Sequence, residues 1–199
     1  MPIKHFFTAD PHFGHEKVLK FSDRHFSSIE EHDNVLIDNI NSLVDRNDIL
    51  WMLGDVSFQP AGKYRARIKC RKIHFIIGNH DHNKSKTVFS TADPVRQIKL
   101  DGQLIYLSHY PNAYWPASHY GSLHLYGHMH RMREETLDAA FPGRRSIDVG
   151  VDNAYHLYGS YRPFRWEEEI KDVLLARPGH DPVEFYRQWE LTNHRHRVE

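Results

Sequence analysis

The sequence predicts a single domain of the α/β class. Three short apolar runs, Ile3–Thr8, Ile49–Leu53 and Ile73–Ile77, have the length and composition of buried strands. Segments with helical character lie between these runs, and strands that alternate with helices are typical of βαβ units and a largely parallel sheet. In such sheets, ligands gather beyond the carboxyl ends of the strands. At 199 residues, the chain has the usual size of one domain with a sizeable core.

The first two strands are joined by a predicted helix over Ile29–Val44. Ser27 and Glu30 have the spacing of a capping box at its start. Apolar residues recur near helical spacing, at Ile29, Leu36, Ile40, Leu43 and Val44. A second predicted helix, Gly62–Cys70, is basic and joins the next pair of strands.

The second half of the chain is predicted to be mainly β. Val95–Leu100 and Leu104–Leu107 flank an Asp-Gly pair at 101–102, which is a strong signal for a two-residue hairpin. Leu123–Tyr126 and Ser146–Val151 add further strand-like runs.

A last helix is predicted over Trp166–Ala176, with acidic residues at its start and Pro178-Gly179 after its end. We therefore expect one domain over residues 1–176. Residues 177–199 are expected to form a C-terminal extension that is partly helical or frayed.

Charge and cysteine content limit the class of protein. Lys plus Arg and Asp plus Glu both number 26, so the overall balance gives no sign of a standing polyanionic partner. Cys70 is the only cysteine, which excludes an intrachain disulfide. The start of the chain lacks the pattern of a signal peptide, and no segment approaches the roughly 20 apolar residues of a membrane span. We expect a soluble cytoplasmic protein without membrane contact.

Five short segments, far apart in the sequence, place metal-seeking side chains beside a glycine or at the end of an apolar run. Asp, Asn and His with almost no sulfur suit two divalent cations such as Mn, Fe or Zn, with an aspartate able to bridge them. A dinuclear hydrolase site is therefore the leading hypothesis. The segments are Asp10-Pro11-His12, Gly54-Asp55, Gly78-Asn79-His80-Asp81, Ser108-His109 and Gly127-His128-Met129-His130.

Two such cations would carry more positive charge than Asp10 and Asp55 neutralise. The remaining excess of about two positive charges favours an anionic substrate and lowers the pKa of bound water toward roughly 7. Paired cations also stabilise the attacking and equatorial oxygens of an in-line phosphoryl displacement. Phosphate-ester hydrolysis is the chemistry that such a site serves best.

In this order, the five segments resemble the motifs of the calcineurin-like metallophosphoesterase superfamily. The resemblance spans Asp10 to His130. It implies two packed mixed β-sheets flanked by helices, a four-layer α/β/β/α sandwich, and two divalent metal ions, with Mn expected and Fe, Zn or Ni as alternatives. His80 would assist the leaving group or stabilise the transition state without binding metal. The implied ligands are Asp10, His12 and His130 for the first metal, Asn79, His109 and His128 for the second, and Asp55 as the bridge.

Within the superfamily, the chain is similar to small bacterial and phage-type members, which the segments Phe13-Gly14-His15 and Arg162-Pro163-Phe164 indicate. It departs from the protein serine/threonine phosphatase branch, because Gly54-Asp55 is not followed by a second Asp and a phosphate-gripping Arg. The group that orients His80 is consequently unassigned. Asp81 fills this role only if its carboxylate points inward, and a turn-stabilising carboxylate is an equally good interpretation.

We expect hydrolysis of a small phosphorylated substrate, a diester or nucleotide rather than a protein phosphate, through attack of a metal-bound hydroxide. One alternative is a nuclease or nucleic-acid end-processing phosphatase, for which the basic stretch 65–72 could supply a track, so that nucleic acid enters only as a substrate. Another is a catalytically silent metal-binding scaffold of the same fold.

Two further features carry alternative interpretations. The aromatic loop Tyr110–Tyr120 either stacks a base or sugar, or forms a rigid packed loop. Arg131 and Arg133 follow the last motif and either reach a substrate phosphate or lie at the surface.

Overall fold

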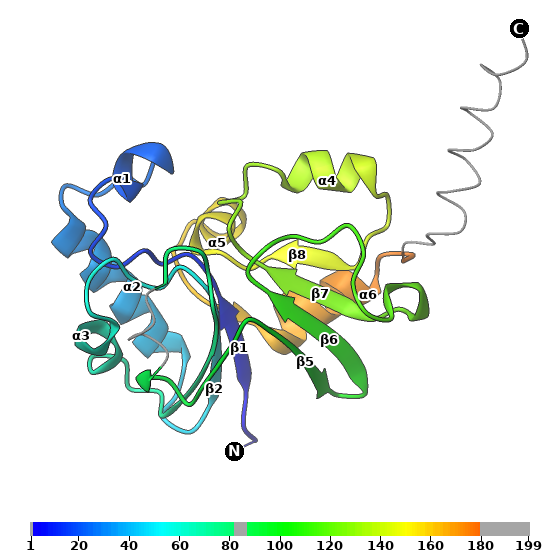
Figure 1. The fold of residues 1–199 in the computed structure, drawn as a ribbon, viewed down its shortest axis with the longest axis horizontal. Coiled ribbons are helices and arrows are strands. Elements are labelled where there is room, and N and C mark those ends of the chain that lie inside the picture. Colours follow the sequence, from blue (N-terminus) through cyan, green and yellow to red (C-terminus); the bar gives the residue numbers. More distant parts are fainter. Residues whose placement is uncertain (1, 82–86, 180–199) are drawn as a thin grey trace, which may run out of the picture.

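Two mixed β-sheets pack face to face in the computed structural model, which describes residues 2–81 and 87–179 (Figure 1). The first has the order β4-β3-β2-β1-β9, with β1 to β4 parallel and β9 antiparallel to β1. Its strands are β1 (His5–Thr8), β2 (Ile49–Leu53), β3 (Lys72–Ile76), β4 (Thr91–Asp93) and β9 (Phe164–Arg165).

The second sheet has the order β5-β6-β7-β8, in which only the β5–β6 pair is antiparallel. Helices flank the paired sheets, so the predicted fold class, two packed mixed sheets flanked by helices, is confirmed. The strands are β5 (Val95–Leu100), β6 (Gln103–Ser108), β7 (Leu123–Tyr126) and β8 (Ser146–Asp148).

The predicted hairpin joins β5 to β6. Leu100 pairs with Gln103, so Asp101 and Gly102 are the two turn residues. Both have positive φ, 47° for Asp101 and 81° for Gly102, as the hairpin turn that matches the strand twist requires.

Side chains of the first sheet alternate between two hydrophobic clusters. Phe6 and Leu50 pack toward the helices on the outer face, whereas Phe7 and Leu53 pack toward the second sheet. Burial of each such side chain stabilises the fold by roughly 1.5–3 kcal/mol relative to exposure. The two clusters therefore hold the strands of the first sheet in position. The second sheet supplies Ile105, Leu107, Leu123, Leu125 and Ile147 to the cluster between the sheets.

Helix α2 (Ile29–Leu43) covers the outer face of the first sheet and ends one residue before the predicted boundary. The predicted capping box is wrong by one residue. Ser28, not Ser27, is the N-cap, and its Oγ accepts a hydrogen bond from Glu31 N at 3.1 Å. The Glu31 carboxylate in turn accepts from Ser27. Two adjacent serines and two adjacent glutamates give the same spacing, so the sequence pattern leaves the register open.

Helix α3 (Ala61–Arg65) is shorter than the predicted helix Gly62–Cys70. The Arg65 side chain donates hydrogen bonds to the carbonyl oxygens of Ile68 and Arg71, and these bonds hold the following residues in a turn. Cys70 is buried at the end of this turn, where its thiol contacts Asp48 O. Side-chain bonds to the backbone therefore replace the expected last helical turn.

The structure contains helices that the sequence interpretation missed, most of them in the second half of the chain. The predicted strand Ser146–Val151 ends at Asp148, because the Asp148 carboxylate accepts a hydrogen bond from Gly150 N at 2.6 Å and turns the chain. Short helices α1 (Val18–Phe21) and α4 (Glu134–Ala140), helix α5 (Val151–Tyr158), and a 3-10 turn at Ser118–Tyr120 were not predicted.

The last predicted helix is present as a π-helical segment, Trp166–Lys171, that continues into α6 (Asp172–Leu175). The Trp166 indole N–H donates to Asp101 Oδ2 at 2.9 Å, which ties this helix to the hairpin turn. The predicted extension lies mostly outside the described residues. Across residues 2–81 and 87–179, helices of the length and apolar content of a membrane span are absent.

The N-cap assignment makes a direct prediction. Replacing Ser28 with Ala removes the acceptor for Glu31 N, and we expect a loss of about 1 kcal/mol in the free energy of unfolding. Ser27→Ala is the matched control, because it removes only an exposed side-chain contact and is expected to cost less. Urea unfolding of both variants measures the difference. A larger loss for Ser27→Ala would contradict the observed register.

Candidate metal centre

All eight predicted site residues lie in loops that follow the carboxyl ends of strands. Because β1, β2 and β3 are parallel, as are β6 and β7, these loops meet at one edge of each sheet. A backbone bridge between Ala9 and Gly150 joins the two sheets at this edge. The residues are Asp10 and His12 after β1, Asp55 after β2, Asn79 and His80 after β3, His109 after β6, and His128 and His130 after β7.

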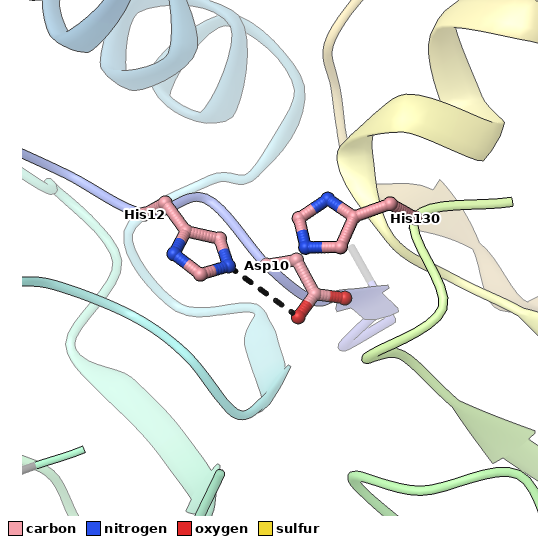
Figure 2. A group of neighbouring side chains, drawn as sticks. All are labelled: Asp10, His12 and His130. Atoms are coloured by element: carbon pink, nitrogen blue, oxygen red, sulfur yellow. Dashed lines mark ion pairs between the residues drawn. The ribbon is translucent and has the colours of Figure 1, made fainter. Parts of the chain in front are cut away.

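The structure brings six of these side chains into two groups. In each group, one ligand atom per residue lies within 4.8 Å of the others. The rings of His12 and His130 lie on either side of the Asp10 carboxylate (Figure 2). Each group draws on both sheets. The groups are Asp10, His12 and His130, and Asp55, His109 and His128.

One carboxylate oxygen lies between the two groups. Asp55 Oδ2 is 3.6 Å from His12 Nε2 of the first group and 3.4 Å from His109 Nε2 of the second. The other oxygen, Oδ1, accepts a hydrogen bond from His80 N at 2.9 Å. The geometry thus directs Oδ2 toward both positions, as a bridging ligand requires.

The ring of His109 is held in one orientation. Its Nδ1 lies 2.8 Å from the Leu53 carbonyl oxygen and therefore carries the donated proton. This leaves Nε2 directed toward the site, where Asn79 Oδ1 is 3.0 Å away. Asn79 therefore joins the second group as an oxygen donor. An outer partner that fixes the tautomer is the usual support for a ligating histidine.

His130 has an equivalent support that the sequence interpretation missed. Its Nδ1 lies 2.6 Å from Asp152 Oδ2, so Nε2 is the nitrogen available to a cation. Asp152 also accepts two hydrogen bonds from Arg24, at 2.8 and 2.7 Å. Neither residue belongs to a local motif, and both lie far from His130 in sequence. Only the tertiary fold identifies them.

The backbone is strained where the ligands occur. Five of the seven predicted ligands have positive φ, a conformation that costs a non-glycine residue about 1–3 kcal/mol and concentrates at functional sites. They are Asp10 (55°), His12 (51°), Asp55 (52°), His128 (70°) and His130 (48°).

Two glycines make room for the ligands. A Cβ at Gly54, where φ is 92°, would lie 2.3 Å from His109 Nδ1. A Cβ at Gly78 would lie 2.3 Å from Asp55 Oδ1. Because both distances are far below van der Waals contact, any side chain at either position would displace a predicted ligand.

Asp81 stabilises the backbone and does not orient His80. Its carboxylate accepts hydrogen bonds from the backbone N–H groups of Asp55, Val56 and Gly78, at 2.7 to 2.9 Å. The turn-stabilising interpretation of Asp81 is therefore the one that the geometry supports. The exposed His80 ring instead lies against Phe58, with 5.1 Å between centroids. Among residues 2–81 and 87–179, no hydrogen bond orients this ring.

Burial and neighbouring charges shift the ionisation of the groups. Burial raises the pKa of Asp10 to about 6, although the charges of His109 and His130 oppose the shift. Burial also disfavours charge on Asp55 and His109, but their hydrogen bond and mutual attraction outweigh it. These contacts lower the pKa of Asp55 to about 2 and raise that of His109 to about 9. Burial and the charges of His130 and Arg24 lower the pKa of His12 to about 2.

The donor set fits divalent cations. Asp10 Oδ1 and His12 Nε2 are buried and have no hydrogen-bond partner. A buried polar atom without a partner costs about 1–3 kcal/mol, and a cation at the first group, to which both atoms belong, would supply that partner. Carboxylate, amide and imidazole donors without sulfur are those that Mn, Fe or Zn accept. The residues present are therefore compatible with a metal pair.

Fold and site together define an α/β sandwich with a candidate metal centre at the edge where its sheets meet. The profile of the calcineurin-like phosphoesterase superfamily domain matches residues 17–150 of the chain. The chain belongs to this superfamily, whose members use divalent metal ions for phosphoester hydrolysis. The match includes six of the eight predicted site residues. Asp10 and His12 precede it, so their place in the site rests on the geometry.

The chain is also similar to two relatives in sequence and to a solved structure in fold. The chain is 32% identical to an uncharacterized protein of Methanocaldococcus jannaschii, over 75% of this chain and 82% of the relative. It is 28% identical to the Gene 66 protein of Mycobacterium phage L5, over 73% and 85%. A protein of unknown function from Aquifex aeolicus has the same fold, with a TM-score of 0.67 and 22% identity over 84% of this chain and 97% of that one.

Metal binding is expected to stabilise the fold and to strengthen as pH rises. A cation must displace protons from His109 and Asp10, whose pKa values are about 9 and about 6. As the pH falls from about 9 to about 6, affinity should fall up to about tenfold per pH unit because of the His109 proton, and more steeply below that, where Asp10 also binds a proton. Thermal unfolding of chelator-treated protein with and without Mn²⁺, over this pH range, measures the effect. His156→Ala, outside both groups, is the control. A midpoint shift that grows on acidification would contradict the site.

Proposed function

We propose that this chain is a dinuclear metal-dependent phosphoesterase that hydrolyses a small phosphate diester, with nucleotides as the favoured substrate class. The observation that carries the proposal is the position of Asp55 Oδ2, 3.6 Å from His12 Nε2 and 3.4 Å from His109 Nε2. One oxygen at comparable distances from two donor groups is the arrangement that a shared ligand needs. Mn is the first candidate metal, with Fe, Zn and Ni as alternatives.

The proposed ligands divide as the two groups do. When bound, the cations supply Lewis-acid activation of water and neutralise charge on the phosphoryl oxygens. His80, exposed and 5.9 Å from the His12 ring between centroids, is the side chain that we propose to assist the leaving group. The ligands are Asp10, His12 and His130 for one metal, Asn79, His109 and His128 for the other, and Asp55 for both.

The contacts of Arg131, next to the last motif, favour a diester. The Arg131 guanidinium lies 2.8 Å from Glu135 Oε1 and 2.9 Å from His156 Nε2, and these contacts hold it against α4 and α5. A dianionic monoester gains most from a guanidinium that grips its oxygens bidentately. Because Arg131 is engaged elsewhere, and Gly54-Asp55 is not followed by an arginine, a singly charged diester suits the site better.

Aromatic rings at the rim favour a substrate with a planar organic group. Phe21 is 48% exposed and lies edge-on to His130, 5.3 Å between centroids. Tyr110 is also 48% exposed and lies 4.5 Å from His128. Each exposed ring thus contacts a proposed ligand of a different metal, where it can stack a base. Trp115, in contrast, is buried and donates to Ser122 O, so that part of the aromatic loop is packing.

A small substrate is favoured over a nucleic-acid strand. Arg65, in the basic stretch that a strand would follow, donates to the Ile68 and Arg71 carbonyls, and Arg67 donates to Asn34 Oδ1. Part of the basic stretch is thereby committed to structure.

We propose cytoplasmic location and no membrane partner, from the lone buried Cys70 and the absence of a spanning helix among the described residues.

Asp55→Asn is expected to lower kcat at least about 100-fold, because a neutral amide is a weaker ligand for both cations than a carboxylate. Hydrolysis of bis-p-nitrophenyl phosphate by Mn-loaded protein measures this. Asp172→Asn, an exposed aspartate on α6, is the matched control and should retain wild-type turnover. Near wild-type turnover in Asp55→Asn would refute the shared-ligand assignment, and an inert wild type would favour the silent scaffold.

The diester preference has its own test. We expect kcat/KM for bis-p-nitrophenyl phosphate to exceed that for p-nitrophenyl phosphate in the Mn-loaded protein, because Arg131 is engaged by Glu135 and His156 and does not clamp a dianion. Faster turnover of the monoester would overturn this preference while leaving phosphoester hydrolysis intact. Binding of DNA or RNA that weakens steeply with salt would instead support the nuclease alternative.

A further inference from the structure

Arg24 is a buried cation that the proposed chemistry does not use. It is 2% exposed and makes five short contacts through its guanidinium. Two go to Asp152, at 2.8 and 2.7 Å, and one to the His32 ring, at 2.9 Å. The other two go to the carbonyl oxygens of Asp10, at 2.7 Å, and Pro11, at 3.0 Å. A buried charge with this many partners is held in one geometry.

The carbonyl contacts fix the turn that carries the first ligands. Asp10 and His12 both have positive φ, so the backbone between them is strained and needs outside support to keep its shape. The Arg24 guanidinium donates hydrogen bonds to the two carbonyl oxygens inside that turn, those of Asp10 and Pro11. The direction of both side chains therefore depends on this guanidinium.

The carboxylate contacts fix the third ligand of the same group. Asp152 Oδ2 accepts from Arg24 Nη2 and from His130 Nδ1, at 2.7 and 2.6 Å. Because Arg24 holds the Asp152 carboxylate in place, that carboxylate fixes the His130 ring with Nε2 facing the site. Arg24 thus reaches ligands that come from loops on both sheets.

The second group is bonded to the first, because His128 N donates to Asp10 Oδ2 at 2.7 Å and His12 N to Asp55 O at 3.1 Å, but it also has supports of its own. Leu53 O fixes His109, and Asp81 fixes the backbone around Asp55. Arg24 contacts neither of them. We infer that Arg24 is the positioning residue of the first metal position, setting Asp10 and His12 through the backbone and His130 through Asp152, while the second position forms without it. This inference rests on the metal pair of the proposed function.

Lysine is the informative replacement. Arg24→Lys keeps a cation beside Asp152, so the buried carboxylate is not left without a charge partner. A single ammonium cannot reproduce the planar fork that spans Asp152 and two carbonyl groups at once. The substitution therefore separates charge compensation from positioning.

Arg144 provides a matched control. It is 4% exposed and, like Arg24, is a buried guanidinium in a polar network, with Asp138 at 2.7 Å and Glu134 at 3.0 Å. Its contacts also include Tyr126 and Ser146, and none is a proposed ligand. Arg144→Lys perturbs a buried network of similar kind on the second sheet, so it reports the effect of lost stability alone.

The test is a Mn²⁺ titration of both lysine variants and the wild type by calorimetry, with the electron paramagnetic resonance spectrum as second readout. We expect two ions with a spin-coupled spectrum in the wild type and in Arg144→Lys. In Arg24→Lys, one ion should bind about 10–100-fold more weakly, with an uncoupled spectrum when the stronger position alone is filled. Wild-type affinity at both positions in Arg24→Lys, or equal weakening in the two variants, would overturn the inference.

These readouts do not depend on turnover. A wild type that binds two coupled ions but hydrolyses no ester would remove the proposed function and leave the role of Arg24 standing. A wild type that binds no Mn²⁺ would overturn both. Thermal unfolding of the two lysine variants in the absence of metal completes the comparison, and we expect similar losses of stability for both.

Discussion

Two carboxylates, Asp10 and Asp55, are almost completely removed from water where the two sheets meet, and the surrounding structure serves to hold them there. A buried anion is tolerated only when fixed donors or cations compensate it. Backbone N–H groups supply part of this compensation, from His128 to Asp10 and from His80 to Asp55. The rest comes from imidazole rings and, in our proposal, from the cations. The same arrangement that makes the site costly also makes it bind metal.

The fold supplies the rigidity that this arrangement demands. Parallel strands bring their carboxyl ends to one edge, and two hydrophobic clusters hold these strands in register. The strained backbone conformation at five predicted ligands, which have positive φ, is tolerated because the preceding strands are held by the packed core. Gly54 and Gly78 leave the space that neighbouring ligands fill. The packed core thus fixes the positions of the polar side chains at the edge where the two sheets meet.

The sequence was most informative where one local pattern determines the structure. The apolar runs predicted β1, β2 and β3 to within a residue or two, because a short buried strand needs little beyond hydrophobicity. The Asp-Gly pair at 101–102 predicted the hairpin, since few residues accept positive φ at both turn positions. The motifs predicted which side chains gather at the site, because each follows a strand directly.

Prediction failed where a specific side-chain contact decides the structure, whether that contact is local or distant in sequence. Asp148 ends β8 early by turning the chain onto Gly150, and Arg65 ends α3 early through bonds to later carbonyls. Helix α4 buries no side chain, and its Glu134 and Asp138 bond to Arg144, which lies beyond its end. Arg24 and Asp152 support the site from positions 128 residues apart. Such pairs have no local signature, so only the folded chain reveals them.

The mixed origin of both donor groups has a consequence for how the protein matures. Each group combines residues from loops on the two sheets, and the bridge between Ala9 and Gly150 forms only when these sheets have docked. A partly folded chain with only the first sheet formed lacks His130 of the first group. It also lacks His109 and His128 of the second group. Both donor groups are therefore complete only after the two sheets have docked, and a partly folded chain offers a cation an incomplete set of ligands.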